Sequence, residues 1–231
     1  MRINKFLSSC GLGSRRKVEE LIKKDLIFVN GKICNDLSKQ ISEQDIVEFQ
    51  NKKLKIENKK ITIMLNKPIG YLVTKTDDRG RKTIYDLLPE KYKNLNYIGR
   101  LDYNSSGLLI LTNDGDLNQK ITKPKNKIPK TYEVTTDKKL TSQELKKLEH
   151  GVVIEGHKTL PAEILNANED KFTITIYEGK KRQIRLMVAS LNAKVVKLKR
   201  IQIGKLKLGN LELGKYKLLE DSSVNLLTKI D

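Results

Sequence analysis

Residues 99–115 read GRLDYNSSGLLILTNDG, a polar loop bracketed by glycines that leads directly into an apolar strand and then a turn. The loop carries one carboxylate, Asp102. A polar loop held by a core strand is a common way for a rigid scaffold to present a reactive group. The alternative is an ordinary surface loop, in which Asp102 caps a turn and Arg100 pairs with it.

Strands and helices are interleaved around this loop. Thr141, followed by Glu144 three residues later, predicts a capped helix over 141–149, and apolar residues at helical spacing predict another over 180–191. This pattern predicts an α+β domain of catalytic size, which we place at residues 61–231. Runs of apolar and β-branched residues predict its strands at 61–65, 131–136, 162–165, 172–177 and 195–203.

Residues 1–49 form a second, smaller unit. Ser14 is a good N-cap for a helix over 15–24, which has a basic face that includes Arg15 and Arg16. Asn30-Gly31 favours a tight hairpin turn after a strand at 27–29, and residues 46–49 predict another strand. The basic face is either simply solvated or an RNA contact, and the charge of the chain favours RNA. Residues 50–60, QNKKLKIENKK, predict an exposed linker.

The composition restricts the class of function. The chain has 231 residues, with 46 Lys+Arg against 28 Asp+Glu and a formal net charge of +18, which attracts polyanions and makes nucleic acid the leading partner. Two cysteines without a CxxC pair and two histidines leave little basis for a thiolate or imidazole metal site, so we expect no metal. No apolar run approaches the roughly 18 residues of a membrane span, so we expect a cytoplasmic protein without membrane contact.

Four motifs give the chain a family resemblance. GRLD followed by SGLLILTNDG resembles the catalytic motif of the bacterial ribosomal RNA pseudouridine synthases of the RsuA/RluB/RluE/RluF family. LNKPIGY at 65–71, KTYEV at 130–134 and EGKKRQIR at 178–185 are similar to the other motifs of that family, in the same order. Residues 1–49 resemble the αL-type RNA-binding module that a ribosomal small-subunit protein also contains. The resemblance implies a mixed, largely antiparallel sheet in the catalytic domain.

The resemblance also implies catalytic roles. Asp102 would be the catalytic aspartate, whose carboxylate acts on the target uridine while the N-glycosidic bond breaks and the base is rejoined through carbon. Tyr132 matches the active-site tyrosine that packs on the base, although a tyrosine in a strand can also be plain core. Arg185 matches the basic position that can pair with the aspartate, or it contacts phosphate. An isomerisation without net redox change or hydrolysis implies no cofactor.

Further residues are expected at the RNA. Arg100 would hold the surroundings of the extruded base, and Val196 and Leu198 would form an apolar floor beneath it, although strand residues of this kind are more often core. Residues 178–207 hold ten basic residues against one acidic residue, as an RNA-binding surface would. The complete set of expected RNA contacts is Arg100, Arg15, Arg16, Lys67, Lys130, Lys181, Arg182, Gln183, Val196 and Leu198.

Two segments bear on the choice of substrate. Gly11–Arg16 and TKTDDRGRKTIYDLLP at 74–89 look more like the RluB-type enzymes, which act on large-subunit 23S RNA, than like the RsuA type, which acts on small-subunit 16S RNA. We expect a monomer acting on naked RNA or on a subunit precursor. Two alternatives remain: an RNA-binding ribosome-assembly factor without catalysis, and a magnesium-dependent nuclease in which Asp102, Asp114 and Asp116 hold the ion.

Overall fold

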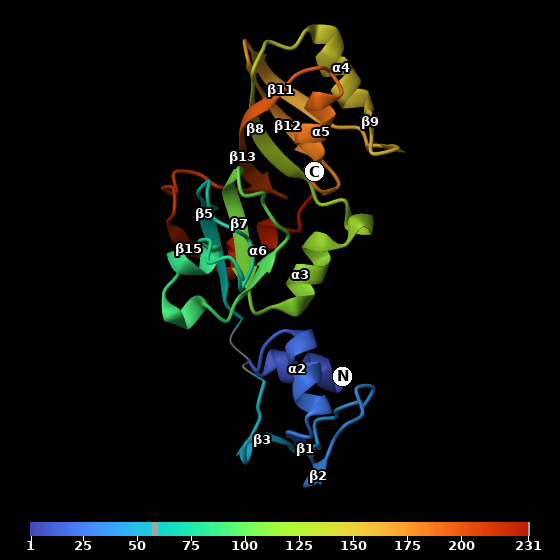
Figure 1. Cartoon of the computed structure of the whole chain (residues 1–231), viewed down its shortest axis with the longest axis vertical. Helices are drawn as coiled ribbons and strands as arrows, with labels where there is room; N and C mark the ends of the chain where they lie inside the picture. The colour runs from blue at the N-terminus through green and yellow to red at the C-terminus, as the bar shows by residue number, and fades with distance from the viewer. Residues whose placement is uncertain (57–59, 231) are drawn as a thin grey trace. The chain divides into compact units, whose positions relative to one another are not determined.

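The computed structural model describes residues 1–56 and 60–230, which divide into two compact units at Lys60/Ile61 (Figure 1). The N-terminal unit packs two helices against a four-stranded antiparallel sheet of order β2-β1-β3-β4. Its core contains Ile3, Leu7, Val18 and Ile22. Its elements are α1 (Ile3–Ser9), α2 (Arg15–Lys23), β1 (Ile27–Val29), β2 (Lys32–Ile33), β3 (Val47–Phe49) and β4 (Lys52–Lys53).

The local signals of this unit are confirmed, apart from the start of the linker. The Ser14 side chain accepts a hydrogen bond from the Lys17 backbone N–H and caps α2, and Asn30 and Gly31 adopt the positive φ angles of a hairpin turn. The predicted linker, however, begins with a second hairpin. Gln50 and Asn51 take φ of 49° and 59°, and β4 then pairs with β3. Residues 57–59 of that linker lie outside the described residues, and the exact domain limits stay a prediction.

The second unit is built on one large sheet, with strand order β11-β12-β8-β13-β7-β5-β15 (Figure 1). Among the described strands, only β7 and β13 run parallel, so the expected mixed and largely antiparallel sheet is confirmed. β14 pairs with β13, β6 pairs with β7, and β9 and β10 form a separate hairpin. The strands are β5 (Thr62–Lys67), β6 (Asn96–Ile98), β7 (Ser106–Thr112), β8 (Lys130–Thr136), β9 (Val153–Ile154), β10 (His157–Lys158), β11 (Glu163–Asn168), β12 (Lys171–Ile176), β13 (Val195–Ile203), β14 (Leu206–Lys207) and β15 (Tyr216–Leu218).

Both faces of the sheet are covered at its centre. Leu109 and Leu111 of β7 join one hydrophobic cluster, whereas Leu108 and Ile110 join another, because successive strand side chains point to opposite faces. Helices α4 and α5 contribute to the first cluster and helix α3 to the second. The unit's α-helices are α3 (Gly115–Thr122), α4 (Ser142–His150), α5 (Gln183–Ala189) and α6 (Asp221–Leu226), and its 3₁₀ helices are η1 (Ile84–Leu87), η2 (Glu90–Tyr92) and η3 (Pro124–Asn126).

The local signals of this unit are confirmed at α4 and shifted at α5 and α3. The capping box of Thr141 and Glu144 is confirmed at α4. The helix predicted from residue 180 begins instead at Gln183, because Arg182 takes a left-handed φ of 54°. The turn expected after the apolar strand leads directly into α3, whose N-cap is Asp114. Among the described residues no helix is long and apolar enough to cross a membrane.

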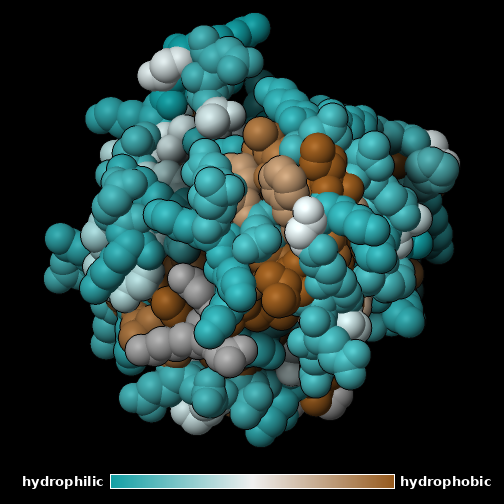
Figure 2. All heavy atoms as spheres, turned by 90° about the horizontal axis from the view of Figure 1, so that it is seen from below, coloured by the Kyte–Doolittle hydropathy of each residue, from teal (hydrophilic) through white to brown (hydrophobic). Residues whose placement is uncertain are grey.

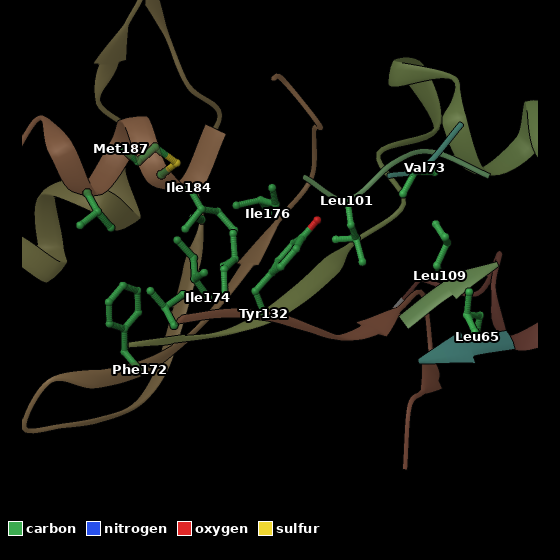
Figure 3. Packing of buried hydrophobic residues seen from close by; sticks show 14 of the residues in the cluster. Leu65, Val73, Leu101, Leu109, Tyr132, Phe172, Ile174, Ile176, Ile184 and Met187 are labelled. Atoms are coloured by element: carbon green, nitrogen blue, oxygen red, sulfur yellow. The ribbon is translucent and has the colours of Figure 1, made fainter. Parts of the chain in front are cut away.

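The high content of charged residues, 32% of the chain, predicts a hydrophilic surface. Figure 2 shows a face that is mostly hydrophilic around a smaller hydrophobic area. The cores, in contrast, are apolar, and Figure 3 shows the larger one, in which aliphatic side chains surround Tyr132 and Phe172.

Candidate active site

Asp102 lies in the loop between β6 and β7, and buried cations fix the backbone of that loop. Lys67, at the end of β5, has no exposed surface. Its ammonium group donates hydrogen bonds to the backbone oxygens of Pro68 at 2.9 Å, Asp102 at 3.2 Å and Ser105 at 2.8 Å. Burial lowers the pKa of Lys67 to about 8, while the nearby Asp102 charge opposes that change. Lys67 therefore ties the aspartate loop to the first strand of the sheet.

Arg185, on α5, holds the other side of the loop. Its Nη2 donates to the Asn104 backbone oxygen at 2.7 Å and to Ser105 Oγ at 3.3 Å, and its Nη1 donates to the Val195 oxygen at 2.9 Å. Burial lowers the pKa of Arg185, and the Asp102 charge opposes this. Among the described residues, no ion pair joins the two side chains. In this structure Arg185 therefore acts on Asp102 by an electrostatic interaction at longer range, while its Nη1 and Nη2 atoms donate to backbone oxygens and to Ser105.

The Asp102 carboxylate itself is half-buried, with no hydrogen-bond partner among the residues that the structure describes. The neighbouring Arg100 is exposed. Gly99, at the start of the loop, has a φ of 64°, and the Ser105 N–H donates to the Asp102 carbonyl oxygen at 3.0 Å, which closes a turn. The backbone is thus fixed while the carboxylate stays available to a ligand, an arrangement that suits general acid–base or nucleophilic chemistry.

Tyr132, on β8, stands next to this loop in the larger core. In Figure 3 its hydroxyl points towards Leu101, the residue before Asp102. Tyr132 is 8% exposed and pairs in register with Arg200 of β13, whose guanidinium carbon lies 6.0 Å from the ring centre. The Tyr132 ring is therefore almost buried, has a cation near its centre and points towards the residue that precedes Asp102.

Arg200 is a site residue that the sequence analysis did not single out. It is 4% exposed, its Nε donates to the Leu108 oxygen at 2.7 Å, and its charge helps to lower the pKa of both Lys67 and Lys130. A signal was present in the sequence. Arg200 is two residues from Leu198, so strand alternation places both side chains on the same face.

The expected RNA contacts separate into exposed and buried groups. Lys67 and Gln183 are buried, so their side chains serve contacts within the protein, and their contact with RNA stays a prediction. Gln183 instead fixes the turn before α5, by donating to Glu178 Oε1 at 2.9 Å and accepting from the Lys180 N–H at 3.0 Å. Lys130 is half-buried, with its ammonium on the Ile128 oxygen at 2.8 Å and its pKa lowered to about 8 by burial. The exposed basic residues are Arg15, Arg16, Arg100, Lys181 and Arg182.

The two residues of the expected apolar floor differ in burial. Leu198 is 7% exposed and belongs to the same cluster as Tyr132. Val196 is 56% exposed, because a bulge between Val195 and Lys197 displaces it from the regular alternation. Only Leu198 therefore has the burial expected of an apolar floor beneath the base.

The carboxylates proposed as a magnesium site have other surroundings. Asp114 accepts hydrogen bonds from the backbone N–H groups of Asp116 and Leu117 as the N-cap of α3. Within residues 1–56 and 60–230, no three His, Cys, Asp or Glu side chains form a group that could hold a metal ion.

Comparisons with known proteins give similarities for both units of the chain. The RNA pseudouridylate synthase family model matches residues 61–190, and the S4 domain model matches residues 1–47. The ribosomal large subunit pseudouridine synthase B of Bacillus subtilis (strain 168) is 40% identical over 86% of this chain and 84% of its own length. The ribosomal small subunit pseudouridine synthase A of Vibrio vulnificus (strain CMCP6) is 36% identical over 88% of this chain and 89% of its own.

A solved structure is also similar along nearly the whole chain. A crystal structure of a pseudouridylate synthase has a TM-score of 0.74 and 32% sequence identity, covering 98% of this chain and 99% of the solved one. The N-terminal unit is accordingly an S4 domain, and the chain belongs to the RNA pseudouridylate synthase family.

Proposed function

We propose that this enzyme isomerises a uridine of ribosomal RNA to pseudouridine, with Asp102 as the catalytic carboxylate and without a cofactor. The observation that carries the proposal is the unpaired Asp102 carboxylate on a loop that Lys67 and Arg185 anchor by its backbone. Fixing the backbone while leaving the side chain free preorganises a reactive group.

The other side chains have roles that follow from their positions. The target uridine must leave its stack to reach a half-buried carboxylate, and RNA loops make that extrusion less costly. The Tyr132 ring stacks on the extruded base above Leu198, and exposed Arg100 holds the neighbouring RNA. Arg185 keeps Asp102 in position through its hydrogen bonds to the Asn104 backbone oxygen and to Ser105 Oγ.

The proposed substrate is large-subunit ribosomal RNA. Its support is the 40% identity to the large-subunit enzyme of Bacillus subtilis, together with the Gly11–Arg16 and 74–89 segments. Small-subunit RNA is the second candidate, because the Vibrio vulnificus relative is 36% identical over a similar share of the chain. We propose that the enzyme works as a monomer in the cytoplasm, on naked RNA or on a subunit precursor, with the basic face of α2 holding the RNA backbone.

The test is pseudouridine mapping of large- and small-subunit ribosomal RNA, naked and in precursor particles, after incubation in EDTA with wild-type protein or with Asp102→Asn. The substitution keeps the size of the side chain and removes its charge. One new site that is absent with the variant would support the proposal and identify the target. Equal modification by both proteins would refute the role of Asp102. RNA binding with no modification by either would favour an assembly factor.

A further inference from the structure

The segment between β5 and η1 forms a closed loop beside the aspartate loop. Its two ends are joined, because the Leu72 N–H donates to the Lys82 oxygen and the Ile84 N–H donates to the Leu72 oxygen, both at 2.9 Å. We call residues 74–82, TKTDDRGRK, the arginine loop. It carries four cations and two carboxylates. A loop whose ends meet can keep its own conformation while it projects from the domain.

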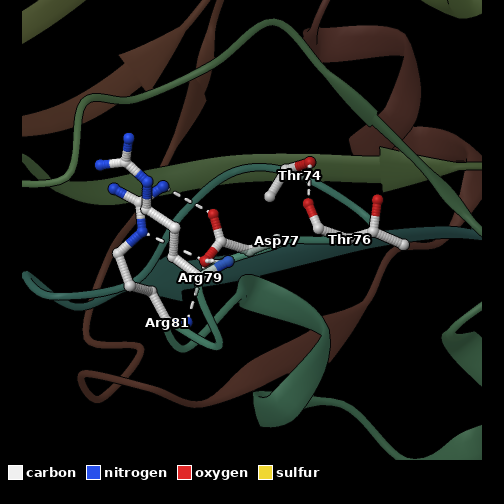
Figure 4. A network of polar contacts seen from close by, with 5 residues as sticks. All are labelled: Thr74, Thr76, Asp77, Arg79 and Arg81. Atoms are coloured by element: carbon white, nitrogen blue, oxygen red, sulfur yellow. Dashed lines mark hydrogen bonds and ion pairs between the residues drawn. The ribbon is translucent and has the colours of Figure 1, made fainter.

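Asp77 organises the arginine loop from within (Figure 4). Its carboxylate accepts hydrogen bonds from the backbone N–H groups of Arg79 at 3.2 Å and Arg81 at 2.9 Å. It also accepts from Nε of Arg81 at 3.1 Å and from Nη2 of Arg81 at 2.6 Å. The Asp77 side chain is only 9% exposed, whereas that of Arg81 is 48% exposed. These hydrogen bonds, with those to Arg81 the largest cause, lower the pKa of Asp77 to about 2.

The arginine loop lies beside the reactive carboxylate. Tyr103 directly follows Asp102, and its backbone oxygen accepts a hydrogen bond from Gly70, at the base of the loop, at 3.0 Å. The Tyr103 side chain is close enough to Arg81 to contribute to the raised pKa of that arginine. Arg79 is exposed and forms no side-chain hydrogen bond or ion pair with the described residues. The loop therefore carries one unpaired guanidinium, that of Arg79, and one oriented guanidinium, that of Arg81, which lies close to Tyr103, the residue after Asp102.

We propose that the arginine loop is a preorganised clamp for the phosphates of the RNA strand that flanks the target uridine, and that Asp77 is its positioning residue. Guanidinium groups suit phosphate because their donors match its oxygens in pairs. Binding an RNA backbone requires these side chains to be ordered, and Asp77 has already ordered the backbone at both arginines and one of the two guanidinium groups. The inference rests on the proposed function for the identity of the RNA.

The proposed clamp and the net charge of the chain predict opposite effects on RNA binding when the Asp77 carboxylate is removed. In a chain with a formal charge of +18, removing a surface carboxylate should strengthen RNA binding or leave it unchanged. If Asp77 positions the arginines, its removal should weaken binding. The neighbouring Asp78 is a matched control, since it is exposed and has no side-chain hydrogen bond or ion pair within residues 1–56 and 60–230.

The experiment compares Asp77→Asn with Asp78→Asn. Dissociation constants are measured for transcripts of large- and small-subunit ribosomal RNA, and KM and kcat on whichever RNA the wild type modifies. We expect Asp77→Asn to raise the dissociation constant and KM by about two- to tenfold, the loss expected when one or two side chains must be ordered on binding. kcat should stay unchanged, and Asp78→Asn should not weaken binding. Binding by Asp77→Asn that is as tight as or tighter than that of wild type would overturn the proposal.

A second variant separates positioning from a general loss of folding. Arg79→Gln removes the unpaired cation without breaking a contact within the described chain. It should raise KM and leave the thermal midpoint unchanged. It should also lower the slope of the logarithm of the dissociation constant against the logarithm of salt concentration by about 1, the change expected when one phosphate contact is lost. An unchanged salt dependence would refute the clamp. If the wild type binds RNA but modifies none, the proposed isomerase fails while the binding comparison still decides the clamp.

Discussion

Replacing Gly107 by alanine should test how closely β7 and β13 approach one another behind the aspartate loop. Gly107 has a φ of 106°, and a Cβ atom there would lie 2.2 Å from the Arg200 backbone oxygen and 2.6 Å from its nitrogen. Both atoms belong to the paired strand, so no side-chain rotation can relieve the contact.

The expected loss combines two effects. A left-handed backbone with a side chain costs about 1–2 kcal/mol. Forcing extra volume into a packed site costs about 1–3 kcal/mol or more. We therefore expect Gly107→Ala to lower the free energy of unfolding by about 3 kcal/mol or more, a large part of the roughly 5–15 kcal/mol of a typical domain.

The assay is urea unfolding followed by circular dichroism and tyrosine fluorescence. Gly115→Ala is the matched control, because Gly115 starts α3 and a Cβ there meets nothing within 4 Å. Alanine is also the better helix former, so the control should be unchanged or more stable by up to about 1 kcal/mol. A loss below about 1 kcal/mol for Gly107→Ala, with an unchanged urea dependence, would refute the close approach of the strands.

Three further outcomes are expected. Lys67→Met should lower the free energy of unfolding by about 1–3 kcal/mol at pH 7 in urea titrations, because buried carbonyl oxygens lose their donor. Because the pKa of Lys67 is lowered to about 8 in the folded protein, the unfolded chain holds more protons than the folded one between about pH 8 and 10.5. The stability of wild type relative to Lys67→Met should therefore rise with pH in that range. A fall would contradict the lowered pKa. Arg185→Lys should reduce the single-turnover rate by about 100-fold with little change in RNA affinity, since it loosens the Asp102 loop; an affinity loss without a rate loss would instead indicate a phosphate contact. Arg15→Gln and Arg16→Gln should each lower by about 1 the slope of the logarithm of the RNA dissociation constant against the logarithm of salt concentration, because each would lose one phosphate contact. An unchanged slope would exclude that arginine from the interface.

The elements that could be predicted from the sequence have strong local causes. The continuous apolar run of β7 belongs to a strand covered on both faces, and it was recognisable for that reason. Ser14 and Thr141 cap their helices through local hydrogen bonds to the backbone, which do not depend on what the helices pack against. β4 was missed because its turn, Gln50-Asn51, lacks the glycine of a typical hairpin signal.

The site was harder to predict, because the role of a charged residue depends on its burial. The motif indicated that Arg185 belongs near Asp102, but not that its donors would serve a backbone oxygen of the loop. Lys67 was expected at the RNA, whereas its ammonium group donates to the Asp102 backbone oxygen. Strand alternation alone does not predict the bulge that exposes Val196. Gln183 resembles a surface residue in a basic segment, yet its buried amide fixes the turn before α5.

The pairing of β5 with β15 has a consequence for how the enzyme folds. Leu65 pairs with Tyr216, so the first strand of the catalytic sheet acquires one neighbour only when almost the whole chain has been synthesised. The parallel pair of β7 and β13 likewise joins Gly107 to Arg200. Such distant pairings slow folding. The S4 domain closes its own sheet within residues 27–53, so it can fold on the ribosome while the catalytic sheet is still incomplete.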